Sequence, residues 1–167
     1  MSVQCEVTAK EAAGQPLGFF ERYLTLWVFL CTGNSCRSQM AEGWGKHLGR
    51  EVAEFESAGI EAHGKNPRAI AVMAEAGVDI SGQESTRVSD DMIRRADIIV
   101  TVCGHADEHC PGLPPGVKKI HWPLTDPAKA TGTESEIMAV FRATRDDIRA
   151  RVTNLIATLR SVSGTGA

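Results

Sequence analysis

The sequence of 167 residues lacks an apolar run long enough to cross a membrane. The run from Leu24 to Leu30 is far shorter than the roughly 20 residues that a transmembrane helix needs. The N-terminus also lacks a basic region followed by a long apolar segment, which a secretory signal would have. We therefore expect a cytoplasmic protein with no membrane partner.

The chain also has little excess charge of either sign, with a formal net charge of -3. Proteins that bind nucleic acids or anionic membranes in general need clustered basic surface. We therefore expect no nucleic acid partner, and any anion site must be local.

Cysteine is too sparse for a disulfide scaffold, and the five cysteines leave at least one unpaired. In a reducing compartment, clustered cysteines are more often catalytic, redox-active or metal-binding. Cys5 lies apart from the others in a polar N-terminal stretch, and we expect no catalytic role for it.

Length and composition indicate one domain. The composition, 43% hydrophobic and 23% charged, suits a well-buried core. A chain of 167 residues is long enough for one such core and too short for two domains. We place the domain at residues 23–160. Residues 1–22 are expected to be a loosely ordered extension, and residues 161–167 a flexible tail.

Short apolar, β-prone runs alternate with helical patterns along the chain. The runs are 24–30, 55–58, 97–102 and 119–124. Helical patterns begin near Ser38, at Pro67, at 89–90 and near Glu134, and Ser38 is placed to cap the first helix. This alternation predicts an α/β fold, a three-layer sandwich with a central four-stranded parallel sheet. Ligands of such sheets bind at the carboxyl ends of the strands.

The most informative segment follows the first apolar run, where Cys31 precedes five small or polar residues and Arg37. Between a strand and a helix, the backbone N–H groups of such a loop form a cradle for a tetrahedral oxyanion, and the guanidinium can grip two oxygens. The same field stabilises a thiolate, so we expect Cys31 to be a nucleophile. The competing interpretation is a buried cysteine beside a surface arginine and a helix cap.

The expected oxyanion-binding residues are Thr32, Gly33, Asn34, Ser35, Cys36, Arg37 and Ser38. For the Cys36 thiol itself we favour a packing role, because a buried thiol away from the charge focus is usually inert.

A second pair of thiols, Cys103 and Cys110, follows the third apolar run and is separated by six residues in a loop that we expect to be mobile. Cys103 would lie on the same rim of the sheet as Cys31. One interpretation is a redox relay, in which Cys103 attacks an oxyanion adduct on Cys31 and Cys110 then attacks the resulting disulfide.

Two other interpretations of this loop remain open. One is a zinc site with Cys103, His105, His109 and Cys110 as ligands, although the adjacent His109 and Cys110 do not match the usual paired spacing. The other is a purely structural loop.

Asp126 follows the fourth apolar run and so lies at the same rim. Breaking a bond between an oxyanion and oxygen leaves a poor leaving group unless an acid protonates it, and a loop carboxyl suits this task. Asp-Pro alone is a turn signal. Its position here makes Asp126 the candidate general acid.

Three stretches, 31–43, 102–111 and 121–128, resemble the low-molecular-weight phosphatase fold family and, within it, the thioredoxin-coupled arsenate reductases. The resemblance runs from about Leu24 to Leu159. Related tyrosine phosphatases commonly carry proline where this chain has Gln39, and they lack the distal cysteine pair. The resemblance therefore favours the reductase.

The resemblance implies a three-thiol mechanism. Cys31 would attack arsenate held by the loop amides and Arg37, while Asp126 protonates the departing oxygen. Cys103 would displace arsenite, and Cys110 would complete a Cys103–Cys110 disulfide for thioredoxin to reduce. Phosphate or sulfate would compete with arsenate for the site.

The resemblance also bears on a metal ion. Some relatives place a potassium ion near the residues that match Asn34 and Ser57, completed by a Thr-Ser-Asp segment. This chain has Glu84-Ser85-Thr86 there, without the aspartate. No other cofactor is expected.

Two alternative functions remain. A phosphotyrosine or small phosphomonoester phosphatase would use only Cys31, Arg37 and Asp126. A non-catalytic anion or metal sensor would bind its ligand at the loop from Cys103 to Cys110.

Overall fold

Four parallel strands in the order β2-β1-β3-β4 form the centre of the structure. The computed structural model describes residues 25–164, with side chains for 25–161. The strands are β1 (Leu26–Cys31), β2 (Glu54–Gly59), β3 (Ile98–Thr101) and β4 (Lys118–His121). The predicted α/β fold with a four-stranded parallel sheet is confirmed. The expected extension at 1–22, with Cys5, lies outside the described residues.

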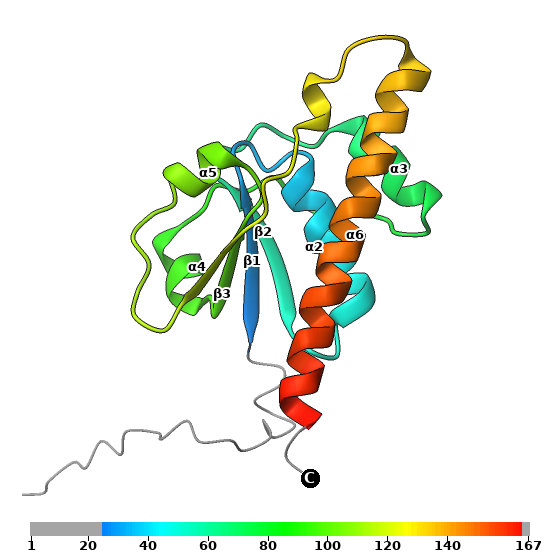
Figure 1. The fold of residues 1–167 in the computed structure, drawn as a ribbon. Helices are drawn as coiled ribbons and strands as arrows, with labels where there is room; N and C mark the ends of the chain where they lie inside the picture. The colour runs from blue at the N-terminus through cyan, green and yellow to red at the C-terminus, as the bar shows by residue number, and fades with distance from the viewer. Residues whose placement is uncertain (1–24, 165–167) are drawn as a thin grey trace, which may run out of the picture.

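Helices flank the sheet on both sides. They are α2 (Arg37–Gly49), α3 (Pro67–Glu75), α4 (Asp90–Arg95), α5 (Gly104–Glu108), the 3-10 turn η1 (Pro127–Lys129) and α6 (Glu134–Gly164). In Figure 1, α2 and α6 lie to the right of β1, and α4 and α5 lie to its left. The sandwich therefore has the three layers that the sequence predicts.

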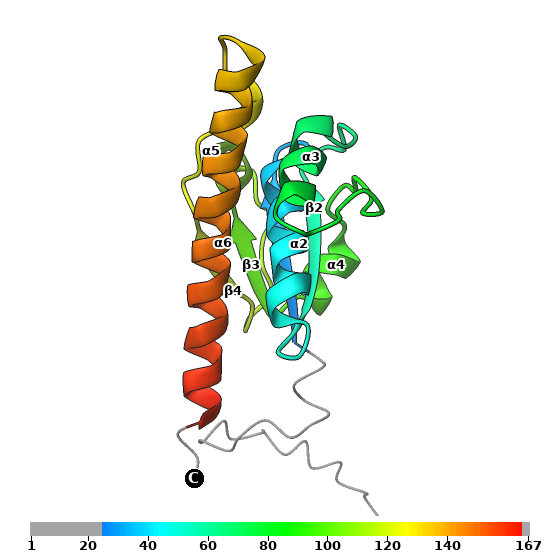
Figure 2. The ribbon, with the colours of Figure 1, turned by 90° about the vertical axis from the view of Figure 1, so that its right-hand side faces the viewer.

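Strand β1 is the centre of the core, because every one of its residues is buried. An apolar stripe along α6 packs towards this core through Phe141, Ile148, Val152 and Ile156, all buried. Figure 2 shows α6 running the full height of the molecule beside α2. Within residues 25–164, no helix combines the length and apolar character needed to span a bilayer.

Helix α6 is longer than expected, because it continues to Gly164 and includes residues 161–164, which we had assigned to a flexible tail. Neither proline nor glycine interrupts the chain between Glu134 and Ser163, so nothing local ends the helix earlier. Residues 165–167 lie outside the described part.

The segment between Cys103 and Cys110 is a short helix rather than the mobile loop that we expected. Cys103 occupies the N-cap of α5, and Ala106 on its first turn is fully buried. The carboxylate of Asp107 accepts a hydrogen bond from Thr101 on β3 and pairs with Lys119 on β4. These tertiary contacts overcome the weak helix propensity of Gly104.

Replacing Phe141 with alanine tests how α6 is docked. Phe141 is fully buried, whereas its neighbour Val140 is 38% exposed. Phe141→Ala should lower the free energy of unfolding by about 3–5 kcal/mol, because it leaves a cavity. Val140→Ala should change it by only about 0.5 kcal/mol. Urea titration measures the free energy of unfolding of both variants. Equally small losses in the two would contradict the packing of Phe141 into the core.

Candidate functional site

The loops after β1, β3 and β4 line one cavity of about 610 Å³ at the carboxyl edge of the sheet. Cys31 and Arg37 stand at the two ends of the first loop, Cys103 comes from the second loop and Asp126 from the third. The structure thus brings together four of the candidate residues. Cys110, half-buried at the other end of α5, is not among the residues that line this cavity.

The loop after β1 turns backbone N–H groups towards the cysteine. The carbonyl oxygens of Thr32 and Gly33 accept hydrogen bonds of 2.8 and 2.9 Å from backbone N–H groups in the segment 61–63. In a planar trans peptide the N–H points away from the C=O, and no described peptide bond is cis. The next N–H groups therefore face the other way, and that of Asn34 donates to Cys31 Sγ at 3.1 Å.

The segment 61–63 packs closely against the loop after β1, and this packing depends on a glycine. A Cβ atom at Gly59, the last residue of β2, would lie 2.1 Å from the Glu61 carbonyl oxygen and 2.7 Å from the Asn34 nitrogen. No side chain fits at such distances. Gly59 therefore allows the 61–63 segment to hold the anion loop, the expected oxyanion-binding segment of residues 31–38.

Ser38 is a second partner of the Cys31 sulfur, with Oγ 2.8 Å away. The prediction that Ser38 caps α2 is wrong, because Cys36 occupies the N-cap position without a side-chain capping bond. Asn34 Nδ2 donates to Ser38 Oγ at 2.9 Å. The Ser38 hydroxyl can therefore accept from Asn34 and still donate its hydrogen to a Cys31 thiolate, which would then receive two donors.

Asn34 is the buried centre of this loop and has a left-handed backbone, with φ of 47°. Asparagine tolerates this conformation better than most residues. The N–H of Thr86 donates to Asn34 Oδ1 at 2.7 Å, which fixes the orientation of the amide, because a backbone N–H can only donate. Its Nδ2 then faces Ser38 and Ser57, at 2.9 and 2.8 Å.

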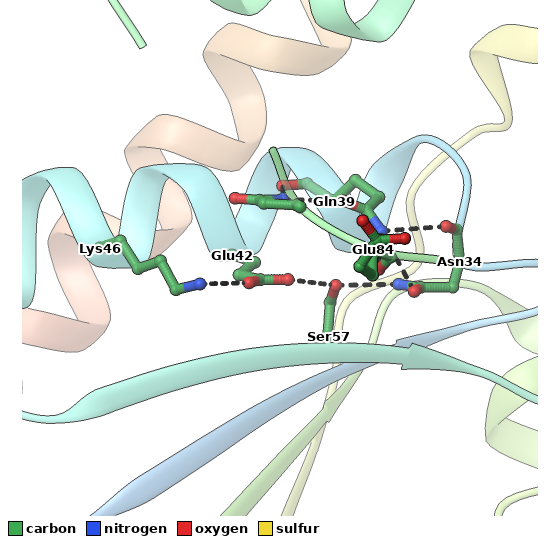
Figure 3. Close-up of polar contacts among 7 residues, drawn as sticks. Asn34, Gln39, Glu42, Lys46, Ser57 and Glu84 are labelled. Atoms are coloured by element: carbon green, nitrogen blue, oxygen red, sulfur yellow. Dashed lines mark hydrogen bonds and ion pairs between the residues drawn. The ribbon is translucent and has the colours of Figure 1, made fainter. Parts of the chain in front are cut away.

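A polar chain continues from Asn34 through the interior to the surface (Figure 3). Ser57 Oγ donates to one carboxylate oxygen of Glu42, and Lys46 donates to the other. The Glu42 side chain is only 9% exposed, so these two donors compensate a largely buried charge.

Gln39 joins the same network from α2. Its Nε2 donates to both the carbonyl oxygen and Oδ1 of Asn34, at 3.1 Å each, and to the Glu84 carbonyl oxygen at 2.9 Å. We predicted no such role for Gln39, Glu42 or Lys46. They recur on one face of α2, opposite its apolar stripe, as residues of a solvated face would, so the sequence held no signal that could have revealed them.

Arg37 is held in place at the mouth of the anion loop and is only 8% exposed. Its guanidinium donates to the Leu124 carbonyl oxygen at 2.9 Å and lies 3.2 Å from Asp126 Oδ2. The other oxygen of Asp126 accepts the N–H of Ala128 at the start of η1. A guanidinium has five N–H donors, so these contacts leave others for an anion.

Cys103 lies against the first loop. Its sulfur is 3.4 Å from Thr32 Oγ1 and accepts the N–H of Ala106 at 3.4 Å. Thr32, the residue directly after Cys31 in the chain, is therefore in contact with the thiol of Cys103. At the far end of α5, burial raises the pKa of the Cys110 thiol.

The structure does not assemble the four side chains proposed as zinc ligands in this loop. All four proposed ligands belong to the described part of the chain, in which no group of three or more histidine, cysteine or acidic side chains is arranged to hold a metal ion.

Cys36 is chemically distinct from Cys31, because burial raises the pKa of the Cys36 thiol to about 12. At pH 8 almost none of it should be thiolate, the form that reacts. Iodoacetamide should therefore modify Cys31 and leave Cys36 intact, as peptide mass mapping would show. In urea, where burial is lost, both should react. Equal modification of the two thiols in the folded protein would contradict this assignment.

Residues 27–163 match the family model of the low molecular weight phosphotyrosine protein phosphatases. The chain is 57% identical over 125 residues to an arsenate reductase of Bacillus licheniformis, and 55% identical over 125 residues to that of Bacillus subtilis. Each match covers 74% of this chain and 89% of the relative. The fold is also similar to a solved arsenate reductase in the phosphate-binding state, with a TM-score of 0.67 and 37% identity over 81% of this chain and 98% of that one.

Proposed function

The chain belongs to the low molecular weight phosphotyrosine protein phosphatase family, and we propose that it reduces arsenate to arsenite with three cysteine thiols. One observation carries this proposal. Cys103 lines the same cavity as Cys31 and is 3.4 Å from the hydroxyl of Thr32. Phosphate ester hydrolysis needs only the first thiol, whereas a second thiol beside it can supply electrons. The similarity to the arsenate reductases of two Bacillus species supports the same activity.

The first step uses the anion loop. Arsenate accepts hydrogen bonds from the loop N–H groups and from Arg37, and the Cys31 thiolate attacks arsenic. An S–As bond forms while one oxygen leaves, protonated by Asp126. The contact of Arg37 to Asp126 is exchanged for contacts to the anion, which frees the carboxyl group for this task.

The second step transfers electrons to arsenic. The Cys103 thiolate attacks the Cys31 sulfur, so that an S–S bond forms and the S–As bond breaks with its electron pair left on arsenic. Arsenic is reduced from As(V) to As(III) and leaves as arsenite, while the two thiols are oxidised to a disulfide.

The third step moves the disulfide outward. Cys110 attacks Cys103, and Cys31 leaves as a thiolate. Because the two cysteines stand at opposite ends of α5 and a disulfide needs Cα atoms within about 7 Å, this helix must unwind. The contacts of Asp107 to Thr101 and Lys119 hold the helix in the reduced form.

A dithiol reductant must then reduce the Cys103–Cys110 disulfide, and we assign this role to thioredoxin in a reducing cytoplasm. Phosphate and sulfate compete for the anion loop because they share the shape and charge of arsenate. The proposal includes no nucleic acid or membrane partner.

We leave potassium out of the proposal. A potassium ion would need oxygen ligands, but Asn34 turns Nδ2 towards Ser57 and its Oδ1 already accepts from Thr86 and Gln39. The nearby Glu42 carboxylate pairs with an ammonium group. These residues do not fit a potassium site.

Serine variants test the three-thiol mechanism. Cys31→Ser, Cys103→Ser and Cys110→Ser should each lose arsenate turnover with thioredoxin, because each removes one sulfur of the relay. Asp126→Asn should lower the turnover by about 10²–10⁴-fold, because it removes an acid. The matched control is Cys5→Ser, which should keep full activity. Full turnover by Cys103→Ser would contradict the relay.

A phosphatase is the second candidate, because Cys31, Arg37 and Asp126 share one cavity and hydrolysis of a phosphate ester does not need the second thiol. The ratio of arsenate reduction to p-nitrophenyl phosphate hydrolysis separates the two functions. Under our proposal, Cys103→Ser lowers this ratio and retains the hydrolysis. A ratio that does not change would favour the phosphatase.

A further inference from the structure

The hydroxyl of Thr32 connects the Cys103 thiol to an imidazole. Thr32 Oγ1 lies 3.4 Å from Cys103 Sγ and 3.3 Å from His105 Nδ1. All three residues line the anion cavity. A hydroxyl can accept one hydrogen bond and donate another, so this geometry forms a short path for a proton.

The second thiol needs such a path, because only a thiolate attacks sulfur and the proton of Cys103 must therefore leave. Cys103 is 6% exposed, which gives bulk water little access to its sulfur. His105 is exposed at the surface and can pass a proton to solvent. Imidazole is also the side chain that exchanges protons most readily near neutral pH.

We propose that His105 accepts the proton of Cys103 through the Thr32 hydroxyl and is thus a positioning residue for the second thiol. This inference rests on the proposed three-thiol mechanism. The thiol proton moves to Thr32 Oγ1 while the threonine proton moves to His105 Nδ1, which leaves a thiolate and an imidazolium. The thiolate then forms the S–S bond to Cys31, and arsenic keeps the electron pair of the broken S–As bond. The imidazolium returns its proton to water.

The surroundings of His105 carry charges of both signs. The titratable groups around it are His109, directly after α5, and, from other segments, Arg37, Glu61, His63, Asp126 and Lys129. The ring of His109 stacks on that of His105, with centroids 4.1 Å apart. The pKa of Glu61 is lowered chiefly by its hydrogen bond to His63 and to a smaller extent by His105.

The test follows the reactivity of Cys103 with pH in the full chain. Reduced protein with Cys31→Ser, which needs no arsenate, is treated with iodoacetamide between pH 5.5 and 9.5, and the modification of each cysteine is mapped by mass. Adding His105→Asn should slow the modification of Cys103 roughly tenfold at pH 7. The two rates should converge near pH 9.5, where an ordinary thiol, with a pKa of about 8.5, ionises without help.

Two further variants make the test specific. Thr32→Val should cause the same change as His105→Asn, and combining them should add nothing, because both break one path. His47→Asn, at an exposed histidine on α2 that does not line the cavity, is the matched control and should leave the pH profile unchanged.

Two results would overturn the proposal. One is an unchanged pH profile in His105→Asn. The other is a rate lowered equally at every pH, which would indicate a purely structural effect. Because this assay involves no arsenate, its failure is distinguishable from failure of the reductase function, which the turnover of the serine variants measures.

Discussion

The buried side chain of Asn34 connects the anion loop to the rest of the fold. Its oxygen is fixed by the Thr86 N–H, so its nitrogen must donate to Ser38 and Ser57. Ser38, which accepts from this amide, has its Oγ 2.8 Å from the Cys31 sulfur and can donate its hydrogen to a thiolate there. Without this amide, the left-handed turn of the loop and the orientation of the nucleophile would both lose their support.

Parallel strand topology explains how the remaining groups meet. Strands β1, β3 and β4 end at one edge of the sheet, so loops far apart in the sequence deliver Cys31, Cys103 and Asp126 to one cavity. The loop after β1 is held by the hydrogen bonds of Asn34, which suits the binding of an anion in one fixed orientation. The short helix α5 rests on a few tertiary contacts around Asp107, which suits a thiol pair that changes partners in the proposed relay.

The sequence was sufficient where local pattern decides the structure. Apolar runs followed by Cys31 and Cys103 predict strands with thiols at one edge, and the sheet agrees. The sequence was insufficient where contacts between residues far apart in the chain determine the local structure. Helix α5 forms in a glycine-led polar segment because Asp107 meets β3 and β4, and Ser38 turns to Cys31 because Asn34 occupies its other side. The roles proposed for the site residues stay predictions.

The most direct test of the three-thiol mechanism is one turnover without a reductant. Reduced protein is mixed with arsenate, or with phosphate as the control, and its thiols are then trapped and mapped by mass. We predict a Cys103–Cys110 disulfide and one equivalent of released arsenite with arsenate alone. If every thiol stayed free while an aryl phosphate was hydrolysed quickly, the protein would be a phosphatase and the relay would be wrong.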